Sequence, residues 1–214
     1  MSQSSQPQTL FKIMFASAGK LSLFVLISVT LLLGVKYITD PIVKEAERQN
    51  LLNTLNQVMP VELYDNDPLQ DTKLITDPEI LTILASEEPV LLYRARKGGN
   101  PAGLVLTTIA PNGYTGNIYM LMGIMADNRV AGVRVLKHKE TPGLGDKIEL
   151  HKDKWILEFD GRNVRDDNDP RWAVKKDGGD FDQFTGATIT PRAVVGAVKR
   201  TLIMAKEHRE FLYE

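Results

Sequence analysis

The sequence predicts an α+β fold, in which a single N-terminal transmembrane helix precedes a soluble domain made of an antiparallel sheet flanked by helices. Three observations carry this prediction. An uncharged apolar run occupies residues 21–35, four β-rich segments lie between residues 90 and 137, and a helical pattern follows Pro191. With 214 residues, the chain is long enough for one core and an anchor, but too short for two full domains with an anchor.

The apolar run predicts a membrane anchor. Counted from Ile13, with only Lys20 interrupting it, the run is close to the ~20 residues that a helix needs to cross a bilayer. A cleavable signal peptide is the alternative, but the residues around Gly34 offer no A-x-A cleavage pattern. We therefore expect an uncleaved, single-pass anchor at residues 13–38, after a short N-terminal segment at residues 1–12.

The charges that flank the anchor leave its orientation open. Lys12 and Lys20 precede the apolar core, while Lys36, Lys44 and Arg48 follow it. Basic residues are expected in excess on the cytoplasmic side, and here neither side has a clear excess.

Beyond the anchor, the spacing of apolar residues over 41–59 predicts a stalk helix, which we place at residues 39–62, before a domain at residues 63–214. Residues 64–77 have little periodicity and are predicted to be a loop, and a short helix is expected at residues 78–86.

The period then changes to that of strands. Strands are expected at residues 90–97, 102–110, 118–127 and 129–137, separated by Gly98-Gly99-Asn100, Pro111-Asn112-Gly113 and Asp127-Asn128. Short turns of this composition predict an antiparallel meander. A helix at residues 147–157 and a terminal helix from Pro191 are expected to cover the sheet. The apolar stripe of the terminal helix consists of Val194, Val195, Val198, Leu202 and Ala205.

Composition excludes several classes of function. The net charge of −1 argues against a nucleic-acid binder, which would carry a basic face. The chain has no cysteine, which excludes disulfides, thiolate catalysis, cysteine-ligated zinc and iron–sulfur clusters. Aspartates cluster at residues 166–169 and 177–182, but they lack the spacing of a calcium loop, and the three histidines are scattered. Any redox chemistry must therefore use a bound organic cofactor.

The run of residues 182–188, DQFTGAT, carries the most functional information. Together with Ile189-Thr190-Pro191, which follow at once, it places Thr185, Thr188 and Thr190 at the start of the terminal helix. Unpaired backbone N–H groups and the positive end of the helix dipole attract a phosphate there. A simpler interpretation is that Thr190 caps the helix before Pro191 at its first position. Both interpretations can hold together.

A second run, HKETPGLG at residues 138–145, lies between a strand and a helix. Thr141-Pro142-Gly143 is typical of a turn. The run lacks the third small residue of a dinucleotide fingerprint, so a nicotinamide site is not expected. Tyr114 lies at the rim of a predicted hairpin, where it either approaches a ligand or shields the edge of the core.

These two runs resemble motifs of the covalent FMN-binding domains of membrane electron-transport complexes. Asp182, Thr185, Gly186, Ala187 and Thr188 match the acceptor motif D-x-x-(S/T)-G-A-T. The resemblance implies that a flavin transferase joins the FMN phosphate to Thr188 through a phosphoester. No residue of the chain is then expected to be a catalyst in its own right.

The second run is similar to the E-T-P-G-L-G loop that lies against the flavin in this family. The resemblance implies that Glu140 and Thr141 hydrogen-bond heteroatoms of the ring and that Leu144 forms an apolar wall. Two separate motifs in the expected order are more specific than either motif alone.

Together with the single anchor, the motifs resemble the RnfG family of Rnf-type electron transport complexes over essentially the whole chain. The resemblance implies an electron-carrier subunit of a ferredoxin:NAD type translocase in the bacterial inner membrane, with a periplasmic domain and other membrane subunits as partners. Two alternatives remain. One is a tethered assembly or binding subunit without a covalent cofactor, and the other is a sensor domain that binds a free phosphorylated ligand.

Overall fold

The computed structural model describes the backbone of residues 7–214 and the side chains of residues 13–214. Of the predicted N-terminal segment, residues 1–6 lie outside the described residues, and residues 7–12 begin the first helix. The chain divides into two compact units, residues Met1–Leu51 and Leu52–Glu214.

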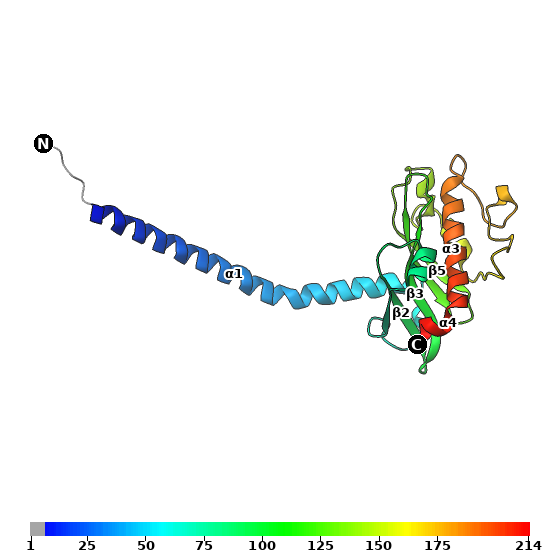
Figure 1. Cartoon of the computed structure of the whole chain (residues 1–214), viewed down its shortest axis with the longest axis horizontal. Coiled ribbons are helices and arrows are strands. Elements are labelled where there is room, and N and C mark those ends of the chain that lie inside the picture. Colours follow the sequence, from blue (N-terminus) through cyan, green and yellow to red (C-terminus); the bar gives the residue numbers. More distant parts are fainter. Residues whose placement is uncertain (1–6) are drawn as a thin grey trace. The chain divides into compact units, whose positions relative to one another are not determined.

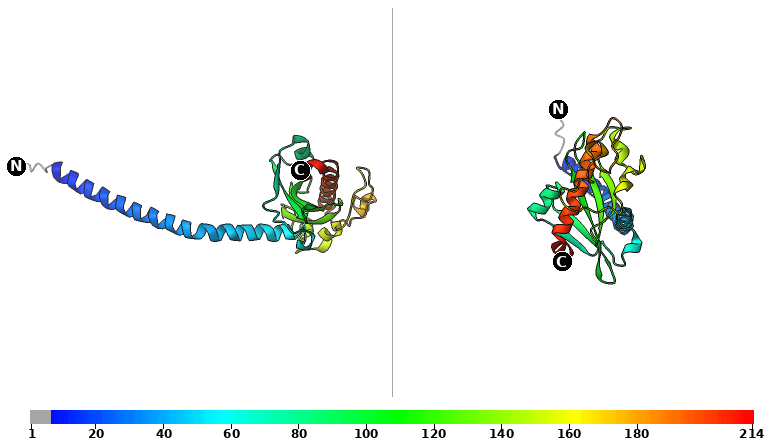
Figure 2. Two further views of the ribbon diagram at one scale, coloured as in Figure 1. Left: turned by 90° about the horizontal axis from the view of Figure 1, so that it is seen from below. Right: turned by 90° about the vertical axis from the view of Figure 1, so that its right-hand side faces the viewer.

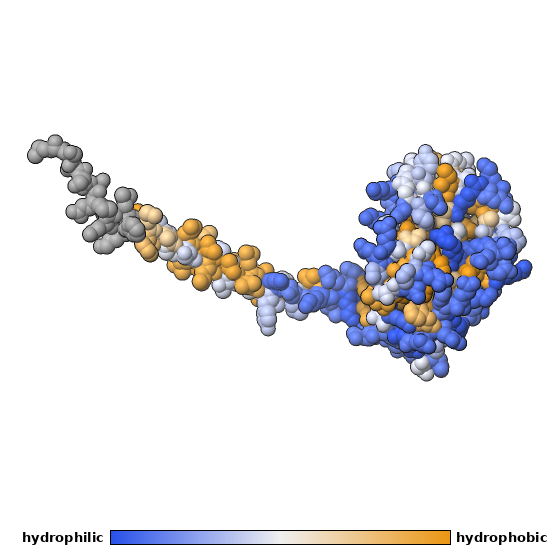
Figure 3. Space-filling view, viewed as in Figure 1, coloured by the Kyte–Doolittle hydropathy of each residue, from blue (hydrophilic) through white to orange (hydrophobic). Residues whose placement is uncertain are grey.

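The first unit is helical. Helix α1 spans Pro7–Asn56 and includes Pro41 in its interior, so the expected anchor and stalk form one continuous helix. Its side chains from Ile13 onward are mostly apolar and exposed as far as Ile38, which gives the band of apolar surface in Figure 3. The described residues contain one helix that is long and apolar enough to cross a membrane. Helix α1 ends at Asn56, before the end of the predicted stalk at residues 39–62.

The second unit is built on a five-stranded antiparallel sheet in the order β1-β2-β3-β4-β5 (Figure 1), which confirms the predicted meander. Its strands are β1 (Thr72–Ile75), β2 (Val90–Lys97), β3 (Asn100–Ala110), β4 (Ile118–Met125) and β5 (Val130–Lys137). The prediction of a loop over residues 64–77 was wrong in part, because β1 forms there and pairs with β2. Gly98 and Gly99, with φ angles of +57° and +78°, make the tight β2–β3 turn.

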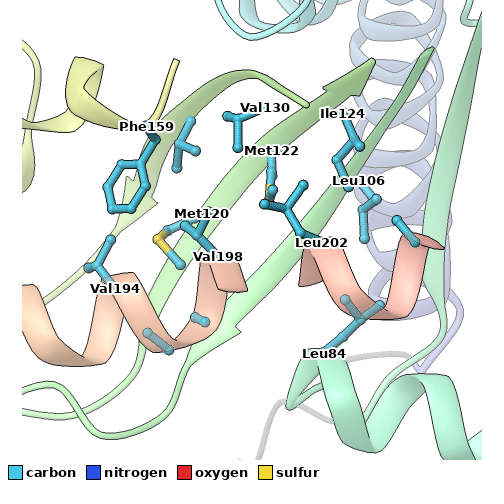
Figure 4. Packing of buried hydrophobic residues seen from close by; sticks show 14 of the residues in the cluster. Leu84, Leu106, Met120, Met122, Ile124, Val130, Phe159, Val194, Val198 and Leu202 are labelled. Carbon is cyan, nitrogen blue, oxygen red and sulfur yellow. The ribbon is translucent and has the colours of Figure 1, made fainter. Parts of the chain in front are cut away.

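Helices cover one face of this sheet, and Figure 2 shows α3 (Ile189–Glu207) lying across the strands. In Figure 4, Val198 and Leu202 of α3 lie beside Met120 and Met122 of β4, and Val194 lies beside Phe159. All five residues of the predicted stripe are buried, which confirms the interpretation of the terminal helix. Helix α2 (Pro78–Leu84) adds Ile80 and Leu84 to the same core, and a short helix α4 (Arg209–Tyr213) ends the chain.

The other face of the sheet holds residues 55–59, at and just after the end of α1. A second cluster consists of Leu55, Val58, Met59, Ala95, Val105 and Leu121. Three glycines on neighbouring strands, Gly103, Gly123 and Gly132, form what we name the glycine patch. A Cβ atom at Gly123 would lie 2.0 Å from the carbonyl oxygen of Val58, so the chain packs directly on bare backbone there.

The predicted helix at residues 147–157 is wrong. Two short 3₁₀ helices occupy this region instead, η2 (Gly145–Ile148) and η3 (Lys154–Phe159). The side chain of Asp153 accepts a hydrogen bond from the N–H of Trp155 at 2.9 Å, which starts a new helix there. The indole of Trp155 then donates to the carbonyl of Asp182 at 2.8 Å, so a tertiary contact sets the local conformation.

Candidate cofactor site

The two motif loops meet at one cavity of about 270 Å³. Three segments line it: the β3–β4 loop, the loop that follows β5, and the acceptor loop with the first turn of α3. The lining residues are Tyr114, Glu140, Thr141, Leu144, Gly145, Gly186, Ala187, Thr188, Ile189 and Thr190. The fold therefore brings together two runs that are far apart in the sequence.

A larger cavity of about 530 Å³ lies elsewhere, beside Arg129, Arg162 and Arg171. Each of these arginines is paired with an aspartate at 2.6 to 3.0 Å. The charges in the larger cavity are thus already balanced, and neither motif reaches it. We therefore place the candidate site at the smaller, more apolar cavity.

Thr188 occupies the N-cap position of α3, and its hydroxyl makes no capping hydrogen bond. The residue is half-buried and lines the cavity. Within the described part of the chain its hydroxyl has no hydrogen-bond partner, so it is available to an incoming group.

Thr190 was expected to be the cap, and this expectation is wrong. It is the second residue of α3, it is fully buried, and its hydroxyl donates to Glu140. Pro191 is accordingly the third helical residue and not the first. The tertiary hydrogen bond to Glu140 outweighs the local preference for threonine at a cap.

Asp182 and Thr185 are exposed and do not line the cavity. The carboxylate of Asp182 accepts a hydrogen bond from Lys175 Nζ at 2.6 Å, and this hydrogen bond raises the pKa of Lys175. The structure therefore separates these two motif residues from Gly186, Ala187 and Thr188, which do face the cavity.

An aromatic cluster packs against the acceptor loop, residues 182–188. Phe184 packs edge-on against Trp155 with 5.1 Å between ring centroids, and its carbonyl accepts from the N–H of Ala187 at 3.0 Å. Gly186 follows with a φ of +82°, a conformation that favours glycine. Sequence reasoning missed Trp155 and Phe184, although an apolar residue inside a polar motif signals an anchor of this kind.

The loop after β5 has the predicted turn. The carbonyl of Thr141 accepts hydrogen bonds from the N–H groups of Leu144 and Gly145, both at 3.1 Å. Leu144 is 42% exposed, which is consistent with an apolar wall open to the cavity. Tyr114 is 66% exposed and lines the same cavity, so it does not shield the core. Ile189, which the sequence analysis did not single out, completes the apolar rim.

Glu140 lies between these segments and is 5% exposed. One carboxylate oxygen accepts from the backbone N–H and the hydroxyl of Thr115 at 3.1 and 3.2 Å, and the other accepts from Thr190. The loop after β5 thus places the carboxylate of Glu140 where Thr115 and Thr190 donate hydrogen bonds to it.

The residues present fit a ring-bearing phosphate ester. Cofactor sites are mostly apolar with a few placed polar groups. Here exposed apolar side chains flank the hydroxyls of Thr141 and Thr188, neither of which has a hydrogen-bond partner among the described residues. The volume is slightly below the roughly 300 Å³ at which ligand pockets begin, so it would enclose only part of a flavin.

Comparison with known proteins matches two families to different parts of the chain. The family described as "RnfG N-terminal region" matches residues 1–58, and the family described as "FMN-binding domain" matches residues 113–203. The second match includes every residue that lines the cavity.

Whole proteins are similar as well. A protein of Shewanella loihica, named as the G subunit of the ion-translocating oxidoreductase complex, is 46% identical over 196 residues, which are 92% of this chain and 91% of that protein. Proteins with the same name from Vibrio parahaemolyticus and Vibrio atlanticus are 45% and 44% identical, and the matches cover 89% and 90% of this chain and 88% and 90% of theirs.

Proposed function

Since the chain belongs to the family of G subunits of the ion-translocating oxidoreductase complex, we propose that it is a membrane-anchored flavoprotein subunit that relays electrons through FMN. The FMN supplies the redox chemistry when it is bound, because the chain has no cysteine and no other evident redox group. The protein contributes tethering, orientation and exclusion of water. Its partners are the other subunits of the complex.

We further propose that the FMN is attached covalently to Thr188. The single observation that carries this proposal is the hydroxyl of Thr188, which faces the cavity without a hydrogen-bond partner among the described residues. In the attachment, the threonine oxygen bonds to the phosphorus of a flavin donor, the bond from phosphorus to the donor's leaving group breaks, and the hydroxyl proton passes to solvent. A flavin transferase would catalyse this step.

The surrounding residues have distinct tasks in this proposal. Leu144, Tyr114 and Ile189 offer apolar surface to the ring and keep water from it. Gly186 and Ala187 leave the approach to Thr188 open, and the positive end of α3 favours a phosphate there. Thr141 also lines the cavity, and in this proposal its hydroxyl hydrogen-bonds a heteroatom of the ring.

Replacing Thr188 with alanine tests the attachment. Expressed with a flavin transferase, the wild-type protein should keep its yellow colour after acid precipitation, whereas Thr188→Ala should be folded and colourless. Thr185→Ala is the matched control, because Thr185 belongs to the same motif but is exposed outside the cavity. Peptide mass mapping should find the added FMN mass on Thr188. Covalent flavin that persists in Thr188→Ala would refute the assignment.

The same measurement separates the alternative functions. Colour that acid releases from the wild-type protein would indicate a freely bound ligand and favour a sensor domain. A colourless wild-type protein would favour an assembly subunit.

We also propose that the anchor lies in a bacterial inner membrane with the domain in the periplasm. An apolar helix long enough to span a bilayer supports the anchor. The orientation is taken from the resemblance to the RnfG family alone. Protease added to spheroplasts should remove the domain, and full protection of an intact chain would place it in the cytoplasm.

A further inference from the structure

Glu140 connects the three segments that form the cavity. Its carboxylate accepts two hydrogen bonds from Thr115 of the β3–β4 loop and one from Thr190 in the first turn of α3. Glu140 itself belongs to the loop after β5. With 5% exposure, it has little surface left for a ligand.

The chain leaves space for this carboxylate on two sides. A Cβ atom at Gly113 would lie 2.8 Å from one carboxylate oxygen, and a Cβ atom at Gly145 would lie 2.8 Å from the other. Real Cβ atoms do not approach so closely, so a larger residue at Gly145 would displace Glu140. At Gly113 a Cβ atom would also lie 2.3 Å from the carbonyl oxygen of Gly116, so the glycine there leaves room for both the loop backbone and Glu140.

The backbone at Glu140 is fixed as well. Its N–H donates to His138 Nδ1 at 3.0 Å, so that nitrogen is an acceptor and His138 Nε2 carries the ring proton. His138 Nε2 then lies 2.8 Å from a carboxylate oxygen of Glu149. Both the main chain and the side chain of Glu140 are thereby held.

We infer that Glu140 is a positioning residue, which holds the first turn of α3 through Thr190 so that Thr188 presents its free hydroxyl to the cavity. Glu140 also engages the hydroxyl of Thr190 in a hydrogen bond, so that this hydroxyl does not compete with Thr188 as the attachment point for the flavin. We assign this role in place of direct hydrogen bonding of the ring, because the carboxylate already accepts three hydrogen bonds from protein donors and Glu140 is 5% exposed. The inference rests on the proposed attachment of FMN at Thr188.

The test compares four variants of the full chain, each expressed with a flavin transferase: Glu140→Ala, Glu140→Gln, Thr190→Val and Thr201→Val. Thr201 is the matched control, because it is also fully buried in α3 and its hydroxyl is bonded to Ala197 and Thr108, away from the cavity. The readouts are the rate of covalent flavin incorporation and the melting temperature of the unloaded protein.

A small misplacement of a reacting group can lower a rate on the order of 100-fold, so Glu140→Ala and Thr190→Val should slow incorporation by roughly 10- to 100-fold. Thr201→Val should slow it much less at a similar loss of melting temperature. Glutamine can accept from Thr115 and donate to the Thr190 oxygen, so Glu140→Gln should restore most of the rate.

Two results would overturn the inference. One is a Glu140→Gln variant that is folded but as slow as Glu140→Ala, which would show that the charge itself is needed. The other is equal slowing in Thr190→Val and Thr201→Val, which would indicate a general loss of stability. A wild-type protein without covalent flavin would instead refute the proposed function, so the two failures are distinguishable.

Discussion

At the scale of single residues, Leu144 offers the most direct probe of the cavity. Core leucines lose about 2 to 5 kcal/mol of unfolding free energy when truncated to alanine, but Leu144 is 42% exposed. Leu144→Ala should therefore destabilise the flavin-free protein by less than about 2 kcal/mol, while it shifts the flavin spectrum or reduction potential.

Leu104→Ala is the matched control for Leu144→Ala, because Leu104 is 1% exposed in the core of the sheet. It should show the full core-sized loss of stability and leave the flavin spectrum nearly unchanged. A core-sized loss in Leu144→Ala with an unaltered spectrum and potential would make Leu144 a packing residue.

The residue chemistry of the site could be predicted only in part from sequence. The threonines were recognised by their motif, yet their individual roles depend on contacts with distant residues. Thr190 satisfies every local preference for a cap, and only the fold brings Glu140 to its hydroxyl. Local propensities cannot anticipate such a contact, because it joins residues that are far apart in the chain.

At the scale of elements, the turn around Asp169 is held by a buried carboxylate. Its oxygens accept from the backbone N–H groups of Arg165 and Arg171 and from the Arg171 side chain, at 2.6 to 3.2 Å. The hydrogen bond from the Arg171 guanidinium holds the pKa of Asp169 well below its ordinary value.

This lowered pKa determines in which direction the stability of the fold changes with pH. Because the folded protein binds this proton less tightly than the unfolded chain, ionised Asp169 stabilises the fold above the ordinary aspartate pKa of about 3.9. The contribution is lost as the pH falls from there through the lowered pKa. Asp169→Asn should lower the free energy of unfolding by about 1 to 3 kcal/mol at pH 7. The difference in unfolding free energy between the variant and the wild type should become smaller below about pH 4.

Urea unfolding followed by tryptophan fluorescence measures this gap, since Trp172 belongs to the same turn. Asp180→Asn is the control, because Asp180 forms a partly exposed pair with Arg162 and should contribute less than about 1 kcal/mol. A gap for Asp169→Asn that stays constant between pH 7 and pH 3 would contradict the assignment.

Elements with many residues and a clear period were predicted well, and short ones were not. The strand predicted at residues 90–97 coincides with β2. Strand β1 has only four residues, too few to show alternation, and it is specified by pairing with β2. The 3₁₀ helix at Lys154–Phe159 is defined by the contact of Trp155 with the acceptor loop, which no local pattern records.

At the scale of the whole molecule, the compact domain begins at Leu52, before the predicted boundary at residue 63. Leu55, Val58 and Met59 are each at most 1% exposed. A fragment from residue 41 to residue 214 should therefore be soluble and folded, because it keeps these side chains.

A fragment from residue 60 onward is the informative comparison. It exposes Val105, Leu121 and the glycine patch to solvent. Each apolar side chain that is lost removes about 1.5 to 3 kcal/mol of the free energy gained by burial. This shorter fragment should aggregate or melt at a much lower temperature in size-exclusion and thermal-unfolding experiments. Equal stability of the two fragments would show that the segment before residue 60 is dispensable.

The glycine patch also has a kinetic consequence. Because Val58 packs on the bare backbone of Gly123, the chain leaves the sheet at a fixed point, and the length of the tether is set by the residues before it. Within an assembled complex, a tethered domain meets a partner site at an effective concentration that tether length and stiffness determine. In the proposed role, a longer or more flexible tether would therefore change the rate of electron exchange without any change in the domain itself.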